Sequence, residues 1–573
     1  MYLPTQIYKM SLNPPSSMTP APSHAYAVAL FTVLCTLLCL ALFLYRVKAT
    51  SLKKTELHRL PPGPAGLPVL GSMHGLVLKR PVFRWIHRLL KDMNTNVLCL
   101  RFGAVHVVVV ACPVVARDVL RKNDAVFASR PLTFASRLFS FGYRCSSLSP
   151  YGEQWKKMRR VLTSEILSMS MEQRLKRQRA EEADHLIRFV YNQCNTSANG
   201  TNSGIVDVRH VAQHFCGNMV RSLMFGTRHF FAAAVGSGNN GSRSPGPEEV
   251  AHVDALFTLL NNVYSFSISD YTPTVWTWIV TALDLDGHKK AAKSVMSTLN
   301  RLHDPIIQER IHEWHSLRKH GDNREARDFL DVLVSLEDSQ GRPLLSFDEI
   351  KAQTAEIMFA SVDNPSNAVE WALAEMMNKP EVMHKAVHEL NNVVGKDRLV
   401  QESDIPQLNY LKACLREAFR LHPYHAFNLP HVAMKDTIVS GYLIPKGCHV
   451  LLSRVGLGRN SDAWDAPLQF QPERHLMIDN KSEHAHVVLT EPDLRFISFS
   501  AGRRGCPAVS LASSVTMMLF ARLLQGFMWT KPPYVHAIEL KESTTSLALA
   551  DHSSYKPCLV CRCISMGLFS HHK

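Results

Sequence analysis

An uncharged apolar run is the first clear pattern along the chain. Residues 25–45, AYAVALFTVLCTLLCLALFLY, carry no acidic or basic side chain. At about 1.5 Å per residue, a helix of this length spans about 30 Å, the thickness of the hydrocarbon core of a bilayer. A basic stretch follows the run and only Lys9 precedes it, so the positive-inside bias places the rest of the chain in the cytosol. We expect a lumenal tail over 1–24, a transmembrane anchor over 25–45 and a basic linker over 46–60. A cleaved signal peptide is the alternative, but its apolar region is usually shorter.

The rest of the chain alternates between helical periodicity and short β-type runs. VLCLRFGAVHVVVVA, residues 97–111, is β-branched and interrupted by Gly103, which predicts a hairpin-like pair of strands. Short β-type runs separated by turns return over 427–454. Helical patterns occupy 115–128, 152–192, 251–320, 349–379, 404–422 and 507–528. The pattern predicts a mainly α fold with a smaller β region. Because no linker divides 61–550, we expect one domain there and a tail of uncertain structure over 551–573.

Composition narrows the class of protein. The chain has 573 residues, a net charge of +15 at pH 7 and 13 cysteines. An odd number of irregularly spaced cysteines is more typical of reduced thiols in a cytosol-facing protein than of a disulfide framework. No module of interleaved aromatic and basic residues accompanies the positive charge, so we expect no nucleic-acid partner. An anionic membrane surface or an acidic protein fits the charge better.

The stretch RFISFSAGRRGCPAVSL, residues 495–511, carries the most informative motif. It fits the spacing Phe-x-x-Gly-x-Arg-x-Cys at Phe499, Gly502, Arg504 and Cys506. A thiolate stays ionised where positive charge and N–H donors surround it, and a helix that begins just after Cys506 adds its positive dipole end. Glycine allows the backbone to turn tightly and point its N–H groups at the sulfur. The motif therefore indicates a thiolate that binds iron, with Arg504 placed to reach an anionic group beside the metal.

This stretch resembles the haem-binding loop of the cytochromes P-450, the haem-thiolate monooxygenases. The resemblance implies the cytochrome P-450 fold with an N-terminal transmembrane helix, haem b as cofactor and Cys506 as the axial ligand of its iron. It also implies O2 as co-substrate and electrons from NADPH, delivered by NADPH–cytochrome P-450 reductase. One departure is Ala508, where the family usually has glycine. Because alanine is small, we expect haem binding to be kept.

Three further segments agree with this resemblance in order and spacing. CLREAFRLHP, residues 414–423, holds Glu417 and Arg420 on one helix face, and the resemblance implies that Arg474 of FQPERHL locks onto this pair. YGEQWKKMRR and FNLPHVA provide the implied partners of the haem propionates. The implied haem contacts are Trp155, Arg159, His431, Phe499, Gly502 and Arg504.

EIMFASVDNPSNAVEWALAEMMNKPE, residues 356–381, aligns with the oxygen-binding helix of the family. Asp363 keeps the family's acid, but Asn364 stands where most members have threonine, and Pro365 follows it. Proline inside a helix removes one N–H donor and opens the hydrogen-bond ladder. In the family the threonine alcohol positions water and relays protons, and an amide relays a proton less readily. We expect Asp363 and Asn364 to be catalytic and the oxygen chemistry to differ from C–H hydroxylation. A tolerated substitution is the alternative.

The string DNPSNAVEWALAEM is similar to the plant amino acid N-monooxygenases, the aldoxime-forming branch of the superfamily. SDYTPTVW, residues 269–276, and LVQESDIPQLNYLKACLREAFRLHP, residues 399–423, support this resemblance, which covers 61–550 and is closest to members that use aromatic amino acids. It implies conversion of an L-amino acid, phenylalanine or tyrosine, to its aldoxime by two N-hydroxylations, dehydration and decarboxylation. This would be an entry step to plant defence metabolites such as cyanogenic glucosides, at the endoplasmic reticulum membrane. Ala501 departs from the branch, which usually has threonine there.

An amino acid substrate brings a carboxylate into a mostly apolar pocket, and a guanidinium is its natural partner. RPLTFASRLFSFGYR, residues 130–144, lies in the family's variable loop over the haem and offers Arg137 and Arg144. A surface position is the alternative for both. Basic side chains beside the implied propionate partners are expected to steer an acidic reductase. These side chains are Lys156, Lys157 and Arg160.

Two other functions stay open. One is a reductase-independent haem-thiolate lyase or isomerase of hydroperoxides, which also lacks the threonine but usually carries an insertion before the cysteine and no N-terminal anchor. The other is a non-catalytic haem-binding protein, against which the kept Asp363 argues. A zinc site in the C-terminal tail is only weakly suggested, because one cluster lacks a second pair of ligands. Its candidate ligands are Cys558, Cys561, Cys563, His571 and His572.

Overall fold

The structure is a computed structural model, and it describes residues 33, 36–37, 59–195, 205–230, 245–272, 274–284, 286–321, 324–476, 486–531, 535–550 and 558–563. The chain divides into two units, residues 1–57 with 67–69, and residues 58–66 with 70–573. The predicted tail over 1–24 lies outside the described residues. So do the predicted anchor over 25–45, except at Val33, Thr36 and Leu37, and most of the linker over 46–60. The cavity and the sheets lie in the second unit.

Helices dominate the second unit, as the sequence predicts. Its α-helices are α2 (His74–Leu78), α3 (Val82–Asp92), α4 (Pro113–Arg117), α5 (Phe134–Phe139), α6 (Glu153–Arg160), α7 (Met169–Arg174), α8 (Lys176–Asn195), α9 (Val208–Phe225), α10 (Pro247–Tyr264), α11 (Thr274–Leu283), α12 (His288–His320), α13 (Phe329–Ser335), α14 (Phe347–Asn378), α15 (Pro380–Val393), α16 (Asn409–Leu421), α17 (Arg454–Gly458) and α18 (Val509–Gly526). Short π-helical turns are η1 (Asp118–Lys122) and η2 (Val161–Ile166). Short 3-10 turns are η3 (Ile268–Asp270), η4 (Glu402–Gln407), η5 (Pro472–His475) and η6 (Gly502–Arg504).

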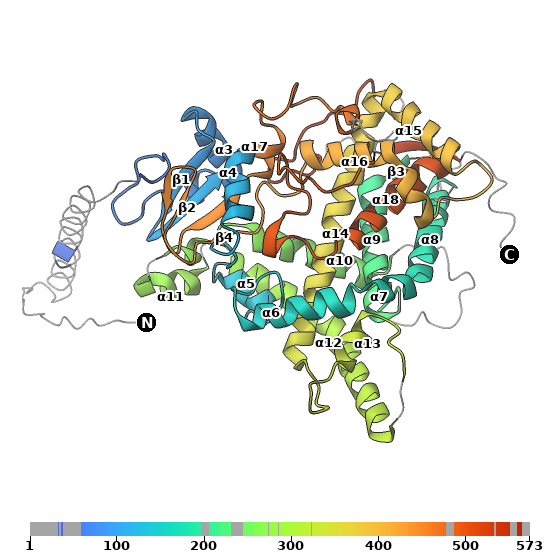
Figure 1. Ribbon diagram of the computed structural model, residues 1–573, viewed down its shortest axis with the longest axis horizontal. Coiled ribbons are helices and arrows are strands. Elements are labelled where there is room, and N and C mark those ends of the chain that lie inside the picture. Colours follow the sequence, from blue (N-terminus) through green and yellow to red (C-terminus); the bar gives the residue numbers. More distant parts are fainter. Residues whose placement is uncertain are drawn as a thin grey trace, which may run out of the picture. The chain divides into compact units, whose positions relative to one another are not determined.

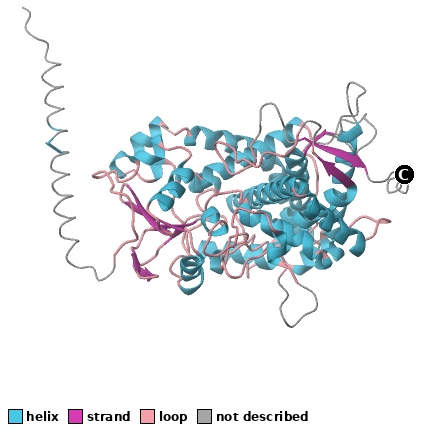
Figure 2. Cartoon of the chain, turned by 90° about the horizontal axis from the view of Figure 1, so that it is seen from above, coloured by secondary structure: helices cyan, strands magenta, loops and turns pink. Residues whose placement is uncertain are grey.

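The strands of the described residues form three small sheets. The first has the order β1 (Val97–Phe102), β2 (Val105–Val110), β7 (His449–Leu452) and β4 (His431–Val432). Its β1 and β2 are the predicted antiparallel pair, whereas β2 and β7 run parallel. The second has the order β3 (Ile205–Asp207), β9 (Cys558–Cys563) and β8 (Phe527–Thr530), and the third pairs β5 (Thr437–Val439) with β6 (Tyr442–Ile444). The first and second sheets lie on opposite sides of the helices (Figures 1 and 2).

Helix α14 is the central element of the helical part (Figure 1). It packs against α9, α10, α16 and α18, and most of its 32 residues are buried around its whole circumference. A helix that is covered on all sides belongs to the interior of a large domain. Its start is fixed by a capping box, because Ser346 Oγ accepts from the Glu349 N–H and the Glu349 carboxylate accepts from the Ser346 N–H. These contacts set the rotation of α14 and therefore which of its side chains face the cavity described below.

Several predicted helices are shorter or more broken than the pattern indicates. The region 152–192 forms α6, η2, α7 and α8, because Ser168 caps a new helix by accepting from the Met171 N–H. The region 404–422 begins as a 3-10 turn that contains Pro406, and α16 starts only at Asn409. Helix α18 ends at Gly526 and the chain continues as β8. Within the described part of the chain, α18 is also long and apolar enough to cross a membrane, but its side chains are largely buried in the protein core.

Candidate active site

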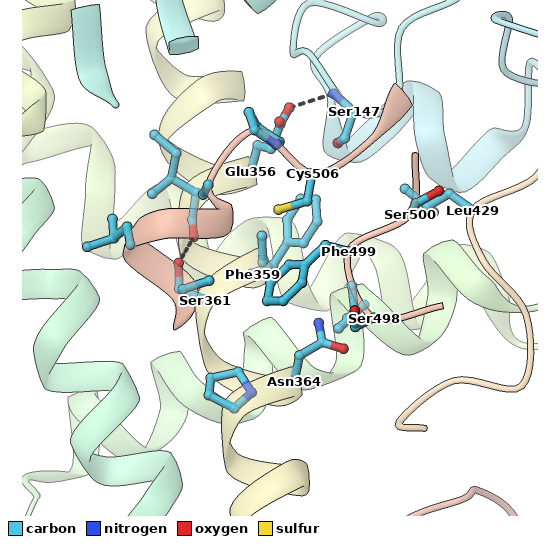
Figure 3. A pocket seen from close by; sticks show the side chains of 18 of the residues that line it. Ser147, Glu356, Phe359, Ser361, Asn364, Leu429, Ser498, Phe499, Ser500 and Cys506 are labelled. Carbon is cyan, nitrogen blue, oxygen red and sulfur yellow. Dashed lines mark hydrogen bonds between the residues drawn. The ribbon is translucent and has the colours of Figure 1, made fainter. Parts of the chain in front are cut away.

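A cavity of about 300 Å³ lies against α14 and the loop that precedes α18. Cys506 and Phe499 line it from the loop, whereas Glu356, Phe359 and Asn364 line it from α14 (Figure 3). Most of the other lining side chains are apolar. The cavity therefore joins the predicted iron-ligand loop to the predicted oxygen-binding helix, although these segments are far apart in the sequence.

The loop geometry around Cys506 explains why its glycines are needed. The Cys506 N–H donates to the Phe499 carbonyl at 2.8 Å, which closes the loop. Gly502 has a φ of +71°, and a Cβ built on it would lie 2.5 Å from the Leu120 carbonyl oxygen and 2.6 Å from the Asp124 carboxylate. Any larger residue at Gly502 would push the loop away from the segment beneath it. The loop is thus held in the conformation that brings the sulfur to the cavity wall.

The electrostatic surroundings of Cys506 are mixed. Burial raises the pKa of the thiol, while the Ala508 N–H and the charge of Arg159 lower it. Ala508 is the residue that precedes α18, so this N–H belongs to the helix start that the sequence predicts behind the cysteine. A thiol in this position loses its proton when it coordinates a metal ion.

Three basic side chains around the loop donate hydrogen bonds to backbone carbonyls. Arg504 donates to the carbonyls of Ala128, Ser146 and Ser149, and its guanidinium lies 4.7 Å from the centre of the Trp155 ring. Arg159 donates to the Gly505 carbonyl at 2.8 Å. Arg130 donates to three further carbonyls, those of Ser147, Leu429 and Pro430.

This region fits a haem with its two propionates. The buried Trp155 Nε1 has no hydrogen-bond partner among the described residues. Because buried donors are normally paired, this N–H is available to an acceptor on a bound group. Arg130, Arg159 and Arg504 add positive charge on the same side. His431 Nδ1 contacts the Phe127 carbonyl at 2.7 Å, and burial together with the charges of Arg130 and Arg504 lowers its pKa well below the usual range. Trp155 and His431 belong to the part of the chain that the structure describes, but neither side chain lines the cavity itself.

Helix α14 separates the two residues predicted to be catalytic. Asn364 lines the cavity, but Asp363 does not. Asp363 is buried, neither of its oxygens has a hydrogen-bond partner in the described part of the chain, and burial raises its pKa well above the usual range. Its charge would act on Cys216 and Tyr424 instead. The two side chains thus lie on different faces of α14, because neighbouring helical residues point about 100° apart, and the predicted catalytic role of Asp363 stays a prediction.

Pro365 does not interrupt α14, which continues to Asn378. Because proline has no N–H, the Ser361 carbonyl four residues earlier lacks its helical donor. Ser361 lies beside the cavity, and its own hydroxyl donates to the Ile357 carbonyl at 2.7 Å. The helix thus offers an unpaired backbone acceptor next to Asn364.

The predicted fork of charged side chains is assembled under the loop. Glu417 accepts two hydrogen bonds from Arg420, at 2.7 and 2.8 Å, and one from Arg474 at 3.1 Å. His475 joins the fork through its Nε2, 2.8 Å from the Glu417 carboxylate. Burial raises the pKa of Glu417, but the hydrogen bonds from Arg420 and His475 together with their charges bring it down to about 2. Sequence reasoning missed His475, although it directly follows Arg474.

The arginines predicted to hold the substrate do not reach the cavity. Arg137 is exposed at the end of α5, and Arg144 forms an ion pair with Asp348 at 3.3 Å. Neither of these described side chains lines the cavity. Arg454, which sequence reasoning did not single out, does line it.

The predicted reductase-facing charges are also partly used within the chain. Lys157 donates to both oxygens of Glu349, at 2.8 and 3.0 Å, and only 28% of its side chain is exposed. Lys156 is exposed and pairs with Glu153 at 2.7 Å. Of the three, Arg160 is exposed and has no ion pair within the described residues. Lys157 therefore ties α6 to the start of α14, while Lys156 and Arg160 stay on the surface.

No group of three or more metal-ligating side chains forms within the described residues. The predicted zinc ligands His571 and His572 lie outside them, and of the C-terminal tail the backbone of β9 is described.

Comparison with known proteins places this cavity in context. The family model described as "Cytochrome P450" matches residues 61–558. The tyrosine N-monooxygenase of Sorghum bicolor is 56% identical over 491 residues, which cover 86% of this chain and 84% of the relative. The tryptophan N-monooxygenase 1 of Arabidopsis thaliana is 50% identical over 86% of each chain, and the valine N-monooxygenase 2 of Manihot esculenta is 50% identical over 88% of each.

Proposed function

Because this chain belongs to the cytochrome P450 family, we propose that it converts an L-amino acid, phenylalanine or tyrosine, to its aldoxime. The reaction consists of two successive N-hydroxylations followed by dehydration and decarboxylation, as an entry step to defence metabolites such as cyanogenic glucosides. The enzyme class, an oxidoreductase of the monooxygenase type, follows from the relatives. The similarity to N-monooxygenases along most of the chain is the observation that carries the proposal.

The residues around the cavity have distinct parts in this proposal. Haem bound through Cys506 would supply the activation of O2. Trp155 Nε1 would provide a free N–H donor for its propionates, and Arg159 and Arg504 would provide positive charge. The fork on Glu417 holds the chain beneath the loop and so keeps the sulfur in place.

On the opposite wall, α14 supplies polar groups without an alcohol at position 364. The Asn364 amide both donates and accepts, so it can hold a water molecule or an amine beside the unpaired Ser361 carbonyl. Burial raises the pKa of Asp363, which lies next to Asn364 in α14 but does not line the cavity. Phe359 and Phe499 line the cavity near Cys506 with apolar surface (Figure 3).

The test is a reconstitution. Microsomes that contain the full chain and the reductase receive NADPH and each of the twenty amino acids in turn, and the products are identified by mass spectrometry. We expect an oxime from phenylalanine or tyrosine. Microsomes with the Cys506→Ala variant serve as the control. Oxidised products without any oxime would contradict the proposal, and turnover of hydroperoxides without reductase would favour the lyase class.

The location and the redox partner are part of the same proposal. We propose that 25–45 anchors the chain in the endoplasmic reticulum with the cavity facing the cytosol, and that NADPH–cytochrome P-450 reductase supplies the electrons. Protease added to sealed microsomes should then digest the domain over 61–550. Full protection of that domain would exclude this topology.

A further inference from the structure

Arg454 is a cavity-lining cation without a partner. It begins α17 directly after β7, where its N–H donates to the Ala426 carbonyl at 2.8 Å and the preceding Ser453 caps the turn by accepting from Gly456. Its guanidinium forms no hydrogen bond or ion pair within the described residues, and its Nε is fully buried. A charge left unpaired beside an apolar cavity is unfavourable until an anion binds it.

The neighbouring cations do not share this property. Arg130, Arg159 and Arg504 all donate to backbone carbonyls. Arg454 also comes from a different element: it begins α17, whereas Arg159 belongs to α6 and Arg504 to η6. Its guanidinium is therefore available to an anion other than the one that Arg159 and Arg504 face.

Glu356 is a negative group on the same cavity. Among the described residues that line the cavity it is the single acidic side chain. Its carboxylate accepts from Ser146 Oγ at 3.1 Å and from the Ser147 N–H at 2.9 Å, the bond drawn in Figure 3. A carboxylate has about four acceptor positions, so two remain free. No cation lies within ion-pair distance of it in the described part of the chain.

Arg454 and Glu356 line the same cavity as Cys506. The cavity wall therefore carries one positive and one negative side chain that form no ion pair within the described residues. An α-amino acid is a ligand that carries the opposite charges on two groups bonded to the same carbon atom.

We propose that Arg454 binds the α-carboxylate of the amino acid and that Glu356 binds its α-amino group. This inference rests on the proposed function and names the residues that recognise its substrate. Arg454 presents parallel N–H donors that match a carboxylate. Glu356 accepts an N–H of the amine from α14, the helix that also carries Asn364, and so fixes which atom of the substrate faces the reaction centre. A ligand that lacks either charged group loses one of the two contacts.

Ligand analogues separate the two contacts. The ligands are tyrosine, tyramine, which lacks the carboxylate, and 3-(4-hydroxyphenyl)propanoate, which lacks the amine. Dissociation constants are measured from the change in the Soret band of the haem-loaded full chain. The variants are Arg454→Gln, Arg454→Lys and Glu356→Gln, with Arg144→Gln as the control on an arginine outside the cavity. If phenylalanine is the amino acid turned over, its own amine and acid replace this series.

Arg454→Gln and Glu356→Gln should weaken the binding of different ligands. We expect Arg454→Gln to weaken binding of the amino acid by about 30-fold or more, as for the loss of one partner of a buried charge pair, and to change binding of the amine less than threefold. Arg454→Lys keeps the charge without the parallel donors, so an intermediate loss is expected. Glu356→Gln keeps an acceptor for Ser147. We expect it to weaken binding of the amino acid about tenfold and to leave binding of the acid that lacks the amine nearly unchanged.

Three results would overturn the inference. One is binding of the amino acid by the Arg454 variants as tightly as by the parent. Another is equal loss for the amino acid and the acid in Glu356→Gln, which would show that this residue only holds the loop around Ser147. The third is a control variant, Arg144→Gln, that also loses binding of the amino acid while binding of the amine hardly changes. The carbon monoxide spectrum of every variant checks haem loading, and if Arg454→Gln does not load, Arg454→Lys decides. A parent that binds and converts no amino acid would instead refute the proposed function.

Discussion

The buried carboxylate of Glu417 makes a contribution to stability that one substitution can measure. Glu417→Gln keeps the shape of the side chain and removes its charge, while Arg420, with 0% of its side chain exposed, stays charged beside it. The pKa of Glu417 is about 2 in place of the ordinary 4.5. At about 1.36 kcal/mol per pH unit, the charged form stabilises the fold by about 3 kcal/mol. Removal of one partner from a buried pair typically costs a similar amount, about 3–5 kcal/mol.

The sign of the pH dependence follows from the direction of this shift. Because the pKa is lower in the folded state, the contribution is fully present above the ordinary value of 4.5 and is lost as the pH falls toward 2. The parent should therefore exceed Glu417→Gln in unfolding free energy by about 3 kcal/mol at neutral pH. The difference should shrink steadily below the ordinary pKa.

Urea unfolding of the haem-loaded chain, followed by the Soret band at several pH values, measures this difference. Glu473→Gln is the control, because this glutamate lies in the same segment but 45% of its side chain is exposed where it pairs with Lys385. Its loss should cost less than about 1 kcal/mol. Equal stability of parent and Glu417→Gln at neutral pH, or a difference that does not change with pH, would refute the reasoning.

Three further predictions concern the cavity. Cys506→Ala should abolish the red-shifted Soret band of the reduced carbon monoxide complex, and a band that persists would show that another residue is the ligand. Asn364→Thr should lower the oxime yield per NADPH and raise the release of peroxide, whereas unchanged coupling would mean that the amide has no chemical role. Gly502→Ala should lose most of its haem, because the new Cβ would lie 2.5 Å from the Leu120 carbonyl oxygen. Gly447→Ala is its control, since Gly447 also has a positive φ but no atom within 4 Å, and equal haem loading of the two variants would contradict the steric argument.

Features encoded by short local patterns could be predicted from the sequence. The Cys506 loop needs one glycine-bounded turn, and β1 and β2 need one interrupted β-branched run, so neighbouring residues are sufficient to indicate both. The pairing of Glu417 with Arg420 follows from their spacing on one helix face, whereas the family resemblance was needed to add Arg474 to the fork. The mainly α fold followed from the long periodic segments, and the structure confirms it.

Features that depend on distant segments could not be predicted in this way. Arg454 becomes a cavity residue only because β7 pairs with β2 and carries α17 to the wall. Lys157 looks like a surface charge until α14 brings Glu349 against it. Asp363 does not line the cavity because packing against neighbouring helices fixes the rotation of α14 about its own axis. The sequence alone does not give that rotation. Arg137 and Arg144 lie in a segment whose path is set by tertiary contacts, so the sequence does not show whether they reach the cavity.

The second sheet has a consequence for how the chain is made. Its middle strand, β9, lies between β3 and β8, which means that the central strand is the one synthesised after both of its neighbours. Until residue 563 leaves the ribosome, β3 and β8 each keep an unpaired edge, and such edges are prone to pair with other chains. The helical part can therefore begin to fold before synthesis of the chain is complete, whereas this sheet can form only after β9 has been synthesised. If the proposed anchor over 25–45 holds the nascent protein at the membrane, these unpaired strands would be exposed on the part of the chain that is synthesised last.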